Sequence, residues 1–81
     1  MPRFYINFWI AGRMVLDDVG QDLPGLEEAK ATAIASAREL LANNIRTKND
    51  AVLDSVVVAN ERGEELATIA AKDLLPDPLK N

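Results

Sequence analysis

The sequence predicts an α+β domain of order β-β-α-β-β, in which four strands form one antiparallel sheet and one helix packs on one face. Two segments, 3–17 and 52–70, are rich in apolar and β-branched residues and each contains a glycine where a hairpin turn is expected. Between them lies an alanine-rich segment with the apolar spacing of an amphipathic helix. The 81 residues allow one domain, which we assign to 1–75, with 76–81 as a loose tail.

The first hairpin is predicted from strands at 3–10 and 13–17. A two-residue loop at Ala11-Gly12 pairs Ile10 with Arg13 and Phe8 with Val15. The polar residues 17–22 that follow are predicted to form a turn.

The helix is predicted to run from Leu26 to about Asn43. Gly25 is an acceptable N-cap, and Glu27 and Glu28 lie in the first turn, where the helix dipole favours negative charge. One apolar stripe follows the helix and consists of Leu26, Ala29, Ala33, Ile34, Ala37, Leu40 and Leu41. Residues 46–50 are expected to be loop, with fraying of the helix into this segment as the alternative.

The second hairpin is predicted from strands at 52–59 and 64–70, joined by the turn at 60–63. A three-residue loop with a glycine bulge pairs Val58 with Leu66 and Val56 with Thr68. Residues 72–75 are expected to form a short turn before Pro76.

Because side chains alternate along a strand, each hairpin presents two faces, and one helix can cover only one of them. The covered set is predicted to be Phe4, Ile6, Phe8, Val15, Val56, Val58 and Leu66. On the opposite side we expect an apolar interface formed by Tyr5, Trp9, Met14, Leu16, Val57 and Ile69. Two alternatives remain open: the C-terminal segment folds over this face with Leu74, Leu75 and Leu79, or a register slip of one residue exchanges the two faces.

The chain has no His and no Cys, which removes most residues used for acid–base, thiolate and transition-metal chemistry. Asp17, Asp18 and Asp22 could bind Ca²⁺ or Mg²⁺, but their spacing is that of a solvated turn and does not match an EF-hand loop. Ser36 and Ser55 lack a histidine to activate them. We therefore expect no catalytic residue, no cofactor and no metal site.

Charge disfavours nucleic-acid and anionic-membrane binding, because the formal net charge is −4 and the nine basic residues are scattered. Tyr5 and Trp9 could stack on bases, but they lack the basic surroundings which that role needs. The apolar stretch near the N-terminus is too short to span a membrane, so a cytoplasmic protein is expected.

The order of motifs resembles a family of short bacterial proteins known only as a domain of unknown function. The matching stretches are Met1-Pro2-Arg3-Phe4-Tyr5, Asp17-Asp18-Val19-Gly20, Leu23-Pro24-Gly25-Leu26-Glu27-Glu28-Ala29, Ala37-Arg38-Glu39-Leu40-Leu41 and Asn60-Glu61-Arg62-Gly63. Two positions depart from the family pattern: Gly25 replaces an aspartate cap, and Trp9 replaces a polar residue. The resemblance implies no activity.

The residues themselves favour a small non-enzymatic protein-interaction module, either a homodimer or a binder of one protein partner, that uses the uncovered sheet face or an edge strand. The alternative is a regulatory domain that blocks a toxin or nuclease, because Leu23-Pro24-Gly25 and the helix start are similar to those of HicB-like antitoxins.

Overall fold

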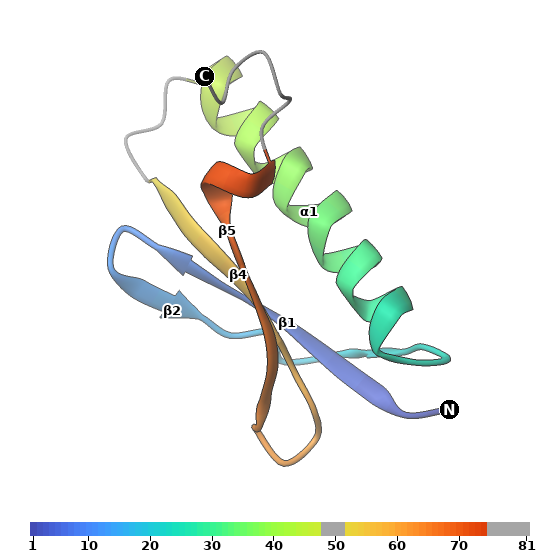
Figure 1. Ribbon diagram of the computed structural model, residues 1–81. Helices are drawn as coiled ribbons and strands as arrows, with labels where there is room; N and C mark the ends of the chain where they lie inside the picture. Colours follow the sequence, from blue (N-terminus) through green and yellow to red (C-terminus); the bar gives the residue numbers. More distant parts are fainter. Residues whose placement is uncertain (48–51, 75–81) are drawn as a thin grey trace.

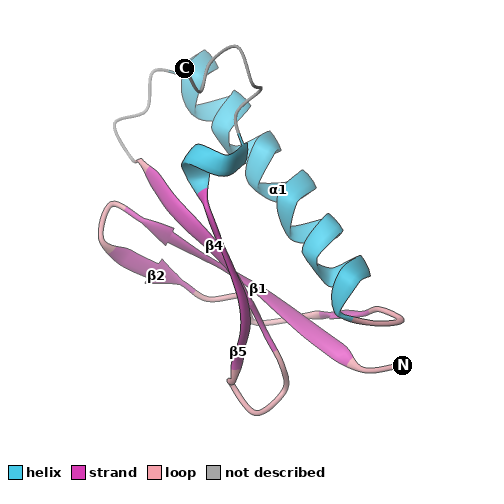
Figure 2. Cartoon of the chain, viewed as in Figure 1, coloured by secondary structure: helices cyan, strands magenta, loops and turns pink. Residues whose placement is uncertain are grey.

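The computed structural model describes residues 1–47 and 52–74. Along the chain come β1 (Arg3–Ile10), β2 (Arg13–Val15), β3 (Gln21–Asp22), α1 (Leu26–Thr47), β4 (Leu53–Ala59), β5 (Glu65–Ala70) and the short 3₁₀ helix η1 (Ala71–Leu74). The strands form one antiparallel sheet in the order β2-β1-β4-β5, with β3 also paired to β1, and α1 lies on one side of it (Figures 1 and 2). The predicted α+β class is confirmed, and the predicted order of strands and helix is matched except for the additional strand β3 before α1.

The β1–β2 hairpin has the predicted register, with Phe8 opposite Val15 and Ile10 opposite Arg13. Its two loop residues both have positive φ, 52° at Ala11 and 78° at Gly12, as a two-residue hairpin turn of type I′ requires. β2 is shorter than predicted, because the chain leaves the sheet after Val15.

The polar segment predicted as a turn contains a further two-residue strand, β3. It pairs with the start of β1, where Arg3 lies opposite Asp22 and Phe4 opposite Gln21. One edge of β1 is therefore paired twice, with β2 near its end and with β3 near its beginning.

The helix begins at Leu26 as predicted, and the carbonyl of Gly25 accepts the amide of Ala29 at 3.1 Å. It continues to Thr47, four residues beyond the predicted end. The reason is that no glycine or proline occurs between Gly25 and Gly63, so nothing in the sequence forces the helix to stop at Asn43.

Three alanines one turn apart, Ala29, Ala33 and Ala37, are completely buried against the sheet. Such small side chains allow α1 to approach β1, β4 and β5 closely. Across from them, the sheet contributes the buried residues Phe4, Ile6, Leu53, Val56 and Val58 to the same core.

The predicted register of the second hairpin is wrong by one residue. The turn itself agrees with the prediction, because Gly63 has a φ of 82° and Ala59 pairs with Glu65. A β-bulge then shifts the pairing, so that Val58 lies opposite Ala67 and Val56 opposite Ile69. A bulge places two residues of one strand against one of its partner, and every residue beyond it changes face.

The chain end described by the structure lies on the helix side of the sheet. Leu74 is buried in the core with α1, and its carbonyl accepts a hydrogen bond from Arg38 Nε at 3.4 Å. Leu74 therefore does not cover the opposite face of the sheet, as the alternative arrangement required. Leu75, Leu79 and the predicted tail at 76–81 lie outside the described residues.

Candidate functional site: the open face of the sheet

We call the side of the sheet turned away from α1 the open face. Strand register assigns residues to it, because residues directly opposite one another share a face. Two rows cross it: Asn7, Val57 and Thr68 form one, and Met14, Trp9, Ser55 and Ala70 form the other. Tyr5 and Ala59 form a further pair. In the first hairpin this alternation agrees with the predicted division, whereas in β5 the residues beyond the bulge lie on the faces opposite to those predicted.

Strand register places four of the six predicted interface residues, Tyr5, Trp9, Met14 and Val57, on the open face, and Leu16 lies at its edge, where it lines hollows on both sides of the sheet. Trp9 is 38% exposed and Leu16 65% exposed, whereas Tyr5 and Met14 are half-buried. Val57 occupies the centre of the face but is only 1% exposed, so its neighbours leave little of it for a partner to contact.

The sixth predicted interface residue, Ile69, was placed on the wrong face. Opposite Val56, it packs against the core on the helix side. The bulge brings Leu66 to the open face instead, where it is 39% exposed. Sequence reasoning missed Leu66, because no residue type in the β5 sequence signals the extra residue of the bulge.

A hollow of about 300 Å³ lies at one end of the open face. Apolar and amide groups line part of it, and carboxylates complete the rim. The lining residues are Tyr5, Asn7, Met14, Leu16, Asp17, Asp18, Ala59, Glu61, Gly63 and Glu65. No lysine or arginine belongs to this described lining, so the hollow is acidic. We call it the acidic hollow.

Asp17 fixes one wall of the acidic hollow through its hydrogen bonds. Its carboxylate accepts backbone N–H groups from Ile6, Val19 and Gly20 at 3.2, 3.0 and 3.0 Å. Burial alone raises the pKa of Asp17, but these three N–H donors outweigh that effect and hold the pKa below its ordinary value. The carboxylate therefore stays charged at neutral pH.

Arg3 holds the connection between β2 and β3 against the open face. Its guanidinium contacts the Asp22 carboxylate at 3.1 Å and donates to the carbonyl of Val19 at 2.8 Å. The aliphatic part of Arg3 and the ring of Tyr5 lie against Gly20, leaving no space for a side chain there. The connection thus has one defined path along the edge of the sheet.

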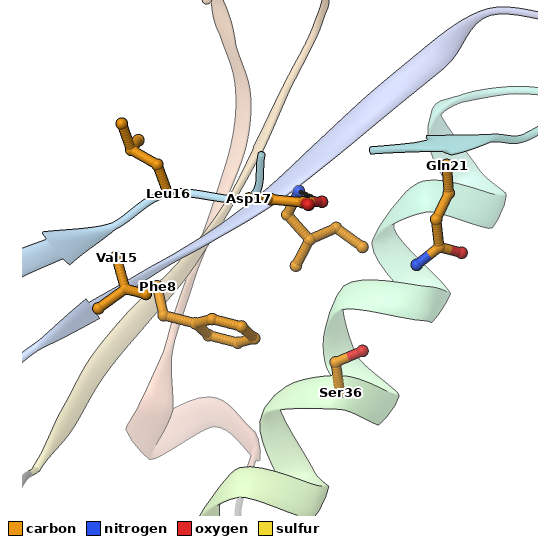
Figure 3. A pocket seen from close by; sticks show the side chains of 7 residues that line it. Phe8, Val15, Leu16, Asp17, Gln21 and Ser36 are labelled. Carbon is orange, nitrogen blue, oxygen red and sulfur yellow. Dashed lines mark hydrogen bonds between the residues drawn. The ribbon is translucent and has the colours of Figure 1, made fainter. Parts of the chain in front are cut away.

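A second hollow, of about 250 Å³, lies on the helix side, where α1 leaves the β2 edge uncovered. Figure 3 shows Phe8 and Val15 on the sheet, with Ser36 across from them on α1. Val15 is 50% exposed because it lies beyond the area covered by the helix. Among the described lining residues, Asp17 is the one acid, and it already accepts three backbone N–H groups, which leaves it poorly placed to activate Ser36.

The three aspartates considered as cation ligands serve different purposes. Asp17 accepts backbone amides, Asp22 pairs with Arg3, and Asp18 is exposed at the acidic hollow. Within residues 1–47 and 52–74, no group of three or more carboxylates is arranged to hold a metal ion.

Among the helices in those ranges, none is long and apolar enough to cross a membrane.

The described residues thus form a small α+β domain, in which α1 lies on one side of a single antiparallel sheet and the other side is open. Residues 3–72 match the family described as Domain of unknown function (DUF6894), and the chain belongs to that family. No curated protein and no solved structure matches it. The similarity to HicB-like antitoxins finds no support in these comparisons.

Proposed function

We propose that this protein is a non-enzymatic protein-interaction module that self-associates through the open face of its sheet. The observation that carries the proposal is the exposure of Trp9, Leu16 and Leu66 on that face, where an antiparallel sheet in contact with water normally presents polar residues. Clustered exposed apolar side chains usually mark an interface, and tryptophan is a frequent anchor there.

The charge of the face limits how tightly two copies can bind. Asp18, Glu61 and Glu65 are exposed around the acidic hollow, and the formal net charge of the whole chain is −4. Two copies therefore repel one another at long range, and salt screens that repulsion. Association driven by apolar contact should consequently strengthen as salt is added.

Sedimentation velocity over a range of concentrations tests the proposal. We expect the wild type to form dimers at high concentration and Trp9→Asp to remain monomeric. The matched control is Ala35→Asp, which places the same charge on an exposed site of α1 and should leave the dimer intact. Circular dichroism verifies that each variant is folded. A wild type that stays monomeric at the highest soluble concentration and in high salt contradicts self-association.

The non-enzymatic part of the proposal rests on the chain's own chemistry. Without His or Cys, a serine nucleophile would need a lysine or carboxylate partner. We expect the protein to act in the cytoplasm. Antitoxin-like regulation is the alternative, and a co-purifying toxin would distinguish it from self-association.

A further inference from the structure

We propose that the preferred occupant of the acidic hollow is an arginine or lysine side chain, presented by an apolar and basic segment of another protein. This inference rests on the proposed use of the open face for binding, and it names a partner other than a second copy, which would compete with self-association for that face. Charge complementarity is the first reason. Asp17, Asp18, Glu61 and Glu65 line the hollow, and no cation does so in the part of the chain that the structure describes.

The carboxylates differ in how they can act on such a partner. The oxygens of Asp17 accept three backbone N–H groups, so Asp17 supplies mainly a fixed negative charge at the wall. The exposed carboxylates of Asp18, Glu61 and Glu65 take part in none of the ion pairs among the described residues. They can therefore accept hydrogen bonds from a guanidinium or ammonium group, whose charge shortens and strengthens such bonds.

The apolar part of the hollow matches the rest of a basic side chain. Tyr5, Met14 and Leu16 line it together with the small buried residue Ala59. Lysine and arginine carry long aliphatic stems that pack on apolar surface while the charged group reaches a polar rim. The ring of Tyr5 can also attract a cation placed over its face.

The size of the hollow is sufficient for one basic side chain. At about 300 Å³ it lies at the lower limit of small-molecule pockets, which range from about 300 to 1,000 Å³. Apolar residues that flank the basic one would cover Trp9 and Leu66 on the same face.

A second copy of this chain matches the hollow less well. Arg3 already pairs with Asp22, and Arg62, which lies in sequence between the lining residues Glu61 and Gly63, already pairs with Glu64. The open face of a second copy would therefore bring mainly carboxylates and apolar groups, so we assign the hollow to a different protein.

The test is a titration of the ¹⁵N-labelled full chain with two capped peptides, one alternating leucine and arginine and the other alternating leucine and glutamate. We expect the basic peptide alone to produce saturable amide shifts at Asn7, Leu16 and Ala59, and its affinity to fall with added salt. Glu61→Gln combined with Glu65→Gln should weaken its binding about five- to tenfold, since exposed ion pairs each contribute a modest factor. Glu28→Gln combined with Glu39→Gln, both at exposed positions of α1, removes the same number of charges and is the matched control.

Three results would overturn the inference: no saturable shift up to millimolar peptide, equal binding of the acidic peptide, or unchanged binding by the double variant. Salt separates this inference from the proposed function, because self-association should strengthen with salt and basic-peptide binding should weaken. A chain that dimerises but ignores the basic peptide keeps the proposed function and loses this inference. A chain that binds the basic peptide but never dimerises supports this inference and contradicts the proposed self-association.

Discussion

The amide of Asp17 donates to Oδ1 of Asn7 at 2.8 Å, while the Asp17 carboxylate accepts the amide of Ile6 at 3.2 Å. Ile6 lies in the gap between the two segments of β1 that pair with β3 and β2. The side chain of Asp17 thus replaces the missing strand at that point. Buried backbone N–H groups need a partner, so this exchange allows the chain to leave the sheet and return without leaving Ile6 unpaired.

We predict that Asp17→Asn lowers the free energy of unfolding by about 1–2 kcal/mol at neutral pH. The neutral amide keeps the shape of the side chain, but it offers one acceptor oxygen and no charge to the three N–H donors. Urea unfolding of the two proteins measures the difference. Asp18→Asn, at the exposed neighbouring residue, should change stability by less than about 0.5 kcal/mol.

The difference in unfolding free energy between the wild type and Asp17→Asn should depend on pH, because the pKa of Asp17 is lowered in the folded protein. A carboxyl whose pKa is lower in the folded state stabilises the fold above its unfolded-state pKa, about 3.9, and loses that contribution as pH falls through the folded-state value. The gap between wild type and Asp17→Asn should be constant from neutral pH to about pH 5 and should narrow below about pH 4. A gap that stays constant down to the acid transition would show that charge is unimportant here.

Gly20 and Gly63 form a matched pair, because both have positive φ, 76° and 82°, but differ in their surroundings. A Cβ at Gly20 would lie 2.9 Å from both Arg3 Cγ and Tyr5 Cε2, whereas at Gly63 nothing lies within 4 Å. We expect Gly63→Ala to cost about 1 kcal/mol for backbone strain alone and Gly20→Ala about 2–3 kcal/mol. Thermal unfolding measures both. Equal losses of stability for Gly20→Ala and Gly63→Ala would mean that the segment between β2 and β3 shifts to accommodate the added methyl group.

The close approach of α1 to the sheet predicts a strong size limit at Ala33, which is completely buried. Ala33→Leu should destabilise the protein by about 1–3 kcal/mol, because the added atoms have no space between helix and sheet. Ala35→Leu makes the same substitution at an exposed position of α1 and should change stability by less than about 0.5 kcal/mol. Urea unfolding of both variants provides the comparison. Similar stabilities would indicate a looser helix–sheet contact than the structure shows.

Local patterns in the sequence predicted most of the fold. The Ala11-Gly12 loop determined the register of the first hairpin, and the alanine spacing identified the buried side of α1. What the sequence did not reveal depends on tertiary contacts. The acidic hollow joins Asp17 and Asp18 to Glu61 and Glu65, more than 40 residues away, and only the folded sheet brings them together.

The bulge in β5 is the clearest example of a feature that could not be predicted from the local sequence. The turn at 60–63 agrees with the prediction, yet one extra residue after Glu65 places Leu66 on the open face and Ile69 on the helix side. In the predicted register, which has no bulge after Glu65 and which we call the straight register, Leu66 would enter the core. In the observed register, Ala67 takes the position opposite Val58 that was expected for Leu66, and Ile69 packs against the core opposite Val56, where Thr68 was expected. Packing against the helix, which the sequence of a single strand does not encode, decides between the two.

Alanine substitution at these two positions tests the observed register directly. Ile69→Ala removes a side chain packed against the core and should lower the free energy of unfolding by about 2 kcal/mol, the lower end for core truncations because Ile69 is only partly buried. Leu66→Ala acts on the open face and should cost less than about 1 kcal/mol. Leu66→Asp should in addition weaken self-association in sedimentation velocity, as Trp9→Asp does. The straight register makes the opposite prediction, with Leu66→Ala the more destabilising of the two, so the order of the two unfolding midpoints decides which register the protein adopts.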